Sequence, residues 1–291
     1  MRAWFIYTLL TMVLWGGWGL VSKPLSSALS PWQVQTFSTL GMIPVLVLLY
    51  FLRDRSRRPH QRRGILLALA AGLIGSLGNV ACYAALAAGG KAAAVMPLTA
   101  LYPLVTIILA WVFLRERLNA IQMSGVVVSL LALFYLNGAE GSSLLSPWLV
   151  VALIPVLLWG ISALLQKLST MHASTESATF AFLLGFIPLA VVTPFLQPMQ
   201  WHLSGANWGL LLVLGCLYGL GNVTLIAAYG RGGRAAIVTP LASLYSLITI
   251  PLAVWLLHEK IGGREGVGIA LSLAAIVALS WEKPPKPKSA L

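Results

Sequence analysis

The chain has 291 residues, of which 59% are hydrophobic and only 9% are charged. A soluble domain carries roughly 25% charged residues, so this sequence lacks the polar side chains needed to cover a water-facing surface. The net charge of +12 does not indicate nucleic-acid binding, because the basic residues lie in short gaps between apolar runs rather than on one face. The composition predicts a membrane protein whose main partner is the lipid bilayer.

Ten apolar segments follow one another along the chain, each about as long as the roughly 20 residues that a helix needs to cross a bilayer. They lie near residues 3–22, 33–52, 64–87, 93–114, 119–138, 147–168, 176–197, 207–229, 235–257 and 263–281. Glycine and charged residues separate them, as is typical of loops. The predicted fold is an all-α polytopic membrane protein with ten transmembrane helices.

The distribution of Lys and Arg over the loops predicts how the chain is oriented in the membrane. With the N-terminus in the cytoplasm, fifteen of the nineteen basic residues lie on the cytoplasmic side. The four on the other side are Lys23, Lys91, Lys260 and Arg264. Both termini are therefore expected in the cytoplasm, where residues 283–291 form a basic tail.

The sequence contains an internal duplication. Residues 78–118 align with residues 221–261 at an offset of 143, and about half of the aligned pairs are identical. The pairs Trp15 with Trp159 and Lys23 with Lys167 align at an offset of 144. We therefore predict two repeats of five helices each, one in residues 1–143 and the other in residues 144–282.

The second repeat is expected to be inverted in the membrane, because an odd number of spans precedes it. The loop charges support this independently. The loop after the second span carries six arginines, whereas the equivalent loop at 197–207 carries none, as expected for loops on opposite sides. Inverted repeats are a recurrent architecture of secondary transporters, with the substrate site near the bilayer midplane.

Polar and aromatic residues recur within the spans at helical spacing. Asn79 and Tyr83 are four residues apart, as are Tyr218 and Asn222, so each pair shares a helix face. Polar groups are costly in lipid and tend to face the bundle interior or a cavity. The candidate substrate-binding residues are Trp15, Trp18, Lys23, Asn79, Tyr83, Thr99, Tyr102, Trp159, Lys167, Tyr218, Asn222 and Tyr245.

These residues also fit structural alternatives that the sequence leaves open. Asn79 and Asn222 are compatible with interhelical hydrogen bonds worth about 0.6 kcal/mol each. Lys23 and Lys167 end their spans and are compatible with side chains that reach the lipid headgroups. The tryptophans of the first span are equally compatible with an interfacial belt or with a cavity wall.

Several functional classes are disfavoured by what the sequence lacks. All acidic residues lie in predicted loops or at span ends, although a pump for cationic drugs would be expected to bury a carboxylate. Glu116 and Glu259 fall in charge clusters at span ends, with proton coupling as the alternative role. No phosphate-binding loop of the form GxxxxGK[ST] occurs. No nucleophile–base pair or metal cluster can be assembled, so we expect neither an enzyme nor a cofactor or metal.

The duplicated pattern also resembles a known family. The residues that carry it are Trp15-Gly16, 97–103, 114–118 and Gly125, with Trp159-Gly160, 240–246, 257–260 and 266–268 in the second half. They resemble the EamA family of the drug/metabolite transporter superfamily. The resemblance implies a carrier of the bacterial inner membrane, with a central cavity formed by spans 1, 3, 4, 6, 8 and 9. It also implies that spans 5 and 10 form a peripheral pair.

Together these features predict a monomeric secondary transporter that exports small neutral or zwitterionic metabolites, such as amino acids, by alternating access. One alternative is a carrier of anionic metabolites that uses Lys23 and Lys167 as counter-charges. Another is a passive channel. Because the duplication pairs the candidate site residues, the cavity is expected to look chemically similar from both sides of the membrane.

Overall fold

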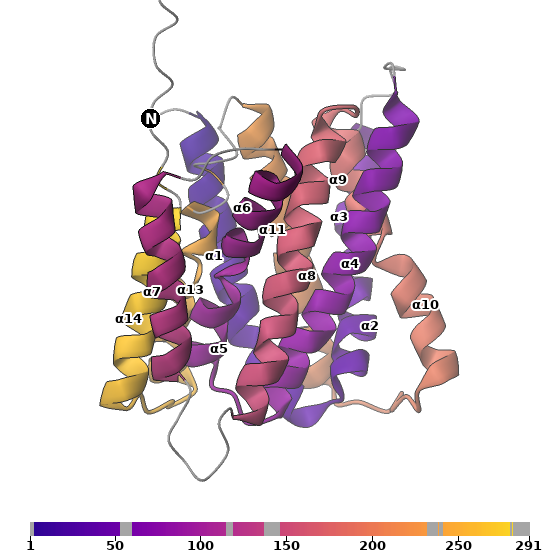
Figure 1. Cartoon of the computed structure of the whole chain (residues 1–291). Coiled ribbons are helices and arrows are strands. Elements are labelled where there is room, and N and C mark those ends of the chain that lie inside the picture. Colours follow the sequence, from indigo (N-terminus) through magenta and orange to yellow (C-terminus); the bar gives the residue numbers. More distant parts are fainter. Residues whose placement is uncertain are drawn as a thin grey trace, which may run out of the picture.

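The computed structural model describes residues 3–52, 60–114, 119–136, 146–231, 238, 241–279 and 281. Within these ranges all regular secondary structure is α-helical, and the helices lie side by side as one bundle (Figure 1). Glu116, Pro240 and the predicted tail at 283–291 lie outside the described residues.

Every predicted span corresponds to one helix or to two consecutive helices. The first repeat contains α1 (Ala3–Ala28), α2 (Pro31–Gly41), α3 (Ile43–Leu52), α4 (Gln61–Ala87), α5 (Ala92–Thr99), α6 (Tyr102–Leu114) and α7 (Ala120–Leu136). The second repeat contains α8 (Pro147–Thr170), α9 (Thr175–Leu184), α10 (Ile187–Leu196), α11 (Gly205–Gly230), α13 (Ser246–Leu256) and α14 (Gly263–Leu279). The predicted fold of ten helical spans is confirmed.

The second and seventh spans are each broken into two helices at the same kind of sequence. The break between α2 and α3 bends the chain by 41°. It falls at Gly41-Met42-Ile43-Pro44, and the break between α9 and α10 falls at Gly185-Phe186-Ile187-Pro188. Proline lacks the N–H that would continue the preceding helix but fits the first turn of a new one. The equivalent breaks show that the duplication extends to details of the backbone.

The two repeats are inverted and pack mainly on each other. The first helices of the repeats, α1 and α8, run in opposite directions through the bundle (Figure 1). Helix α1 packs against α11, and its counterpart α8 packs against α4. The last helices, α7 and α14, pair with each other at the edge of the bundle. The interface between the repeats therefore forms the core of the molecule.

A glycine allows each first helix to approach the other repeat closely. A Cβ atom on Gly16 would lie 2.7 Å from the Cβ of Ile248, and one on Gly160 would lie 2.5 Å from the Cβ of Val105. At the same places Thr249 Oγ1 donates to Gly16 O at 2.9 Å, and Thr106 Oγ1 donates to Gly160 O at 3.0 Å. These matched contacts bring the candidate side chains of both repeats to the centre of the bundle.

Candidate substrate site

Trp18 on α1 is the centre of an aromatic cluster to which both repeats contribute. Its ring centroid lies 6.0 Å from that of Tyr83 on α4, 5.8 Å from Trp159 on α8 and 5.7 Å from Tyr218 on α11. Trp18 Nε1 donates to the Tyr83 hydroxyl at 3.2 Å, and the Trp18 side chain is only 2% exposed. The structure therefore brings together four candidates from four different helices.

Asn79 and Tyr102 join this cluster through Trp159. Trp159 Nε1 donates to Asn79 Oδ1 at 3.1 Å and to the Gly75 carbonyl oxygen at 3.3 Å. The Trp159 ring meets Tyr102 edge to face, with centroids 6.3 Å apart. The indole is thus fixed between α4 and the start of α6, where its N–H group is satisfied.

Trp15, the counterpart of Trp159, occupies the equivalent place in the other half of the bundle. Its ring meets Tyr245 edge to face at 6.1 Å, and it packs against Gly221 on α11 as Trp159 packs against Gly78 on α4. Its Nε1 atom is buried and has no hydrogen-bond partner among the described residues. The corresponding amide, Asn222, instead donates through Nδ2 to the Tyr218 carbonyl oxygen at 2.9 Å.

Tyr245 connects the second repeat to Thr99, the remaining central candidate. The Tyr245 hydroxyl lies 3.3 Å from Thr99 Oγ1 and donates to the Met96 carbonyl oxygen, also at 3.3 Å. Both oxygens belong to the last turn of α5. Thr99 and Tyr245 are both buried. Their contact holds the fourth span, in the first repeat, against the ninth span, in the second repeat.

The two lysines lie away from this centre. Lys23 Nζ donates to the Leu86 carbonyl oxygen at 2.9 Å and to the Gly90 carbonyl oxygen at 2.8 Å. It therefore caps the C-terminal end of α4, where a cation is favoured by the helix dipole. Lys167 is exposed in the last turn of α8, at the opposite end of the bundle. The structure thus brings ten of the twelve candidates together and separates the two lysines from them.

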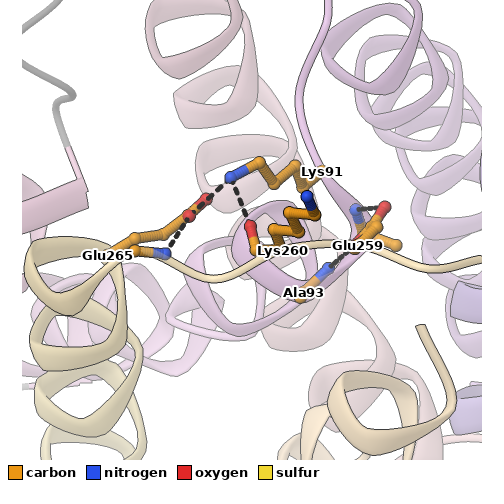
Figure 2. Close-up of polar contacts among 7 residues, drawn as sticks. Lys91, Ala93, Glu259, Lys260 and Glu265 are labelled. Atoms are coloured by element: carbon orange, nitrogen blue, oxygen red, sulfur yellow. Dashed lines mark hydrogen bonds and ion pairs between the residues drawn. The ribbon is translucent and has the colours of Figure 1, made fainter. Parts of the chain in front are cut away.

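A charged cluster at one end of the bundle joins the repeats across the loop between α13 and α14 (Figure 2). Glu259 Oε1 accepts from Ala92 N at 2.8 Å, and Oε2 accepts from Ala93 N at 2.9 Å. Lys91 Nζ donates to the Lys260 carbonyl oxygen at 2.7 Å and to Glu265 Oε2 at 2.6 Å. The carboxylate of one repeat therefore caps the first N–H groups of α5 in the other, where negative charge is favoured.

The comparisons with known proteins identify the family of the chain. The sequence profile of the EamA-like transporter family matches residues 2–138 and 146–281, one match for each repeat. The chain belongs to the EamA-like transporter family. It is therefore a multi-pass membrane transporter for small molecules and not an enzyme.

A solved structure supports the fold of this EamA-like transporter. One crystal structure of another protein matches with a TM-score of 0.65 and 18% sequence identity. The match covers 94% of this chain and 94% of the other. At that identity it speaks for the fold alone. No curated protein matches the EamA-like chain in sequence.

One polar feature of this EamA-like transporter was not among the sequence candidates. Helix α2 buries a set of polar side chains, namely Gln33, Gln35, Thr36, Ser38 and Thr39. The signal was present in the sequence as polar residues at i, i+3 and i+4 within an apolar run. The equivalent helix of the second repeat, α9, does not repeat this set.

The pairing of the repeats therefore does not extend to α2 and α9. At the offset of 144, Gln35, Ser38 and Thr39 are replaced by Thr179, Phe182 and Leu183. Phe182 packs on Phe186, which in turn contacts Tyr218, with ring centroids 5.5 Å and 5.4 Å apart. The expectation of a chemically similar cavity from both sides does not hold at these helices.

Proposed function

We propose that this EamA-like transporter is a secondary transporter that exports a small neutral or zwitterionic metabolite, such as an amino acid, by alternating access. The observation that carries the proposal is the central cluster of aromatic and amide side chains around Trp18, which both repeats supply. In inverted-repeat transporters the substrate binds near the midplane, at the interface between the repeats.

The chemistry of the cluster favours a solute without net charge. Aromatic faces and amide groups offer stacking, hydrogen bonds and cation–π contacts. Among the described residues, the acidic side chains lie in first turns or loops at the ends of spans, namely Glu176, Glu259 and Glu265. A solute with a net positive charge would therefore find no buried counter-charge in this part of the chain.

The anionic alternative receives less support. It uses Lys23 and Lys167 as counter-charges, but Lys23 already donates to two backbone carbonyls at the end of α4. Two of the three N–H donors of the ammonium are thus committed to the carbonyls that it caps, which leaves one for an anion. We therefore retain an uncharged or zwitterionic solute as the proposal.

The difference between equivalent contacts supports a two-state mechanism. The Trp159–Asn79 hydrogen bond is made, whereas the Trp15 Nε1 atom has no such partner within the described ranges. Inverted repeats in different conformations open the site to one side of the membrane at a time. The central rings pack on one another here, so a bound solute must separate them.

We further propose that the protein is a monomer in the bacterial inner membrane with both termini in the cytoplasm. The charge distribution over the loops favours this orientation. In that orientation the cluster of Lys91, Glu259 and Glu265 closes the outer end of the bundle. Opening the site outward, as export requires, then breaks the Glu259 cap on α5.

Counterflow in proteoliposomes tests the function. Vesicles loaded with an unlabelled mixture of the twenty standard L-amino acids are diluted into buffer that contains each labelled amino acid in turn. A carrier accumulates its substrate transiently because the unlabelled substrate leaves through the same site. Trp18→Ala is expected to abolish the accumulation, and Lys167→Ala to preserve it. Equal uptake with and without the internal amino acids would instead indicate a channel.

A further inference from the structure

The buried polar face of α2 is turned away from lipid, toward the helices that carry the central cluster. Leu40 on α2 is 43% exposed and marks the face turned to lipid. At 3.6 residues per turn, Gln35 and Ser38 lie about 140° and 160° around the helix from Leu40. Gln35 and Ser38 are both only 1% exposed. Helix α2 packs between α4 and α11, the two helices that carry Tyr83 and Tyr218.

The hydrogen bonds around Thr39 determine which way the Gln35 amide is turned. The Thr39 hydroxyl has one hydrogen, and it is donated to the main-chain carbonyl oxygen of Gln35 at 2.8 Å. Thr39 Oγ1 must therefore accept its second hydrogen bond, which comes from Gln35 Nε2 at 3.2 Å. The amide nitrogen thus lies on the Thr39 side, and the amide oxygen is directed away from Thr39.

That oxygen, Gln35 Oε1, is buried and has no hydrogen-bond partner in the described part of the chain. A buried acceptor without a partner is costly and requires an explanation. Polar groups inside membrane spans commonly mark the path of a substrate. Gln35 therefore presents a fixed, unpaired acceptor in a fold that belongs to a transporter.

Helix α4, against which α2 packs, carries Tyr83 of the aromatic cluster. The Tyr83 hydroxyl accepts from Trp18 Nε1 at 3.2 Å. Since α2 follows the C-terminal end of α1, Gln35 lies one turn closer than Ser38 to the end of the bundle that carries the Glu259 cap.

We propose that Gln35 Oε1 binds the amino group of the transported solute, as a polar subsite beside the aromatic rings of Trp18 and Tyr83. An amide oxygen accepts from an ammonium group, and neighbouring aromatic faces stabilise the cation. A zwitterion would thus be recognised without a buried carboxylate on the protein. The inference rests on the proposed function, because it assigns one group of the solute to one residue near that site.

The subsite exists in only one repeat, which provides a matched control. The residue equivalent to Gln35 is Thr179 on α9, which is 2% exposed. Its hydroxyl donates to the Thr175 carbonyl oxygen at 2.7 Å and is thus satisfied within its own helix. A substitution at Thr179 removes a buried polar group at the equivalent place without removing an unpaired acceptor.

Binding to the purified full-length protein tests the assignment. The twenty standard L-amino acids are first ranked by the thermal shift that each produces. Calorimetry then measures the dissociation constant of the amino acid that gives the largest shift. The same measurement is made for its deamino analogue and for its decarboxylated analogue, an amine. Gln35→Leu is expected to raise the constants of the amino acid and the amine about tenfold. The constant of the deamino analogue should stay within about twofold, and Thr179→Val should leave all three unchanged.

A second variant decides the matter if Gln35→Leu does not fold. Gln35→Glu keeps the size and the acceptor oxygen, and it should tighten binding of the decarboxylated amine while weakening binding of the deamino analogue. Equal effects of either variant on all three ligands, or no effect, would overturn the subsite and leave the proposed function intact. If no amino acid binds the wild-type protein, both the subsite and the proposed amino-acid substrate are wrong.

Discussion

The indole nitrogen of Trp159 donates to Asn79 Oδ1 at 3.1 Å, and the equivalent nitrogen of Trp15 has no partner among the described side chains. Both rings pack against a glycine of the facing helix, Gly78 or Gly221, in the same way. The two halves of the duplication therefore place the same residues at the same contact and differ in the hydrogen bond. If the repeats exchange conformations during transport, the bond should form in one half as it breaks in the other.

Replacing the two tryptophans by phenylalanine should have unequal effects on stability. Trp159→Phe loses a hydrogen bond and leaves the Asn79 amide oxygen unpaired, which should cost about 1 kcal/mol. Trp15→Phe removes a donor that is already unpaired, so this variant should lose less stability. Thermal unfolding of the purified variants measures the difference. Equal melting temperatures would show that the two contacts do not differ in solution.

The crossing of α11 with α2 should tolerate no side chain at Gly215. A Cβ atom there would lie 1.7 Å from the Ser38 carbonyl oxygen, so the helices must separate. Gly215→Ala should cost more than about 2 kcal/mol and lower the yield of folded protein. On the same helix, no atom lies within 4 Å of a Cβ added at Gly209. Gly209→Ala should therefore be neutral or stabilise the protein by up to about 1 kcal/mol. Monodispersity after detergent extraction and the melting temperature distinguish the two variants.

The Glu259 cap should contribute more to stability than the neighbouring ion pair. Glu259→Ala removes the acceptor of two backbone N–H groups at the start of α5, which should cost about 1–2 kcal/mol. The Lys91 and Glu265 side chains are 42% and 20% exposed, so Glu265→Gln should cost less than about 1 kcal/mol. Glu259→Gln keeps one acceptor oxygen, so its loss of stability should lie between those of Glu259→Ala and Glu265→Gln. A larger melting-temperature loss for Glu265→Gln than for Glu259→Ala would contradict this ranking.

The proposed orientation predicts which loop is reached from outside the cell. In a variant with Cys82 and Cys216 replaced by serine, single cysteines are introduced at Ala88 and Met171, which are both exposed at span ends. A membrane-impermeant maleimide on intact cells should label Ala88→Cys and not Met171→Cys. Both should react after the membrane is made permeable. The reverse pattern on intact cells would place the termini outside.

The spans and their duplication could be predicted because both depend on local sequence. An apolar run of about 20 residues specifies a spanning helix wherever it lies, and identities such as Tyr102 with Tyr245 persist in register. The residues that gather around Trp18 were also identified, since polar and aromatic groups in spans turn away from lipid. The break at Met42 was not predicted, although Pro44 signals it, because hydropathy does not register a change in helix direction.

The role of Glu259 depended on information that the sequence does not contain. It caps a helix 166 positions away in the chain, and that contact follows only from how the inverted repeats dock. Read locally, Glu259 was one member of a charge cluster at the end of a span. Gln35 was not among the candidates for a different reason, since the unpaired state of its amide oxygen follows only from the surrounding side chains.

The divergence of α2 from α9 has a kinetic consequence for a carrier that is not coupled to an ion gradient. Microscopic reversibility requires the ratio of maximal rate to half-saturation constant to be the same in both directions. A solute that meets the amide of Gln35 on one approach and the ring of Phe182 on the other has unequal half-saturation constants. The side of tighter binding must then have the slower maximal flux. With Gln35 on the outer approach, the maximal efflux into solute-free medium exceeds the maximal influx into solute-free cells, while net flux still follows the solute gradient.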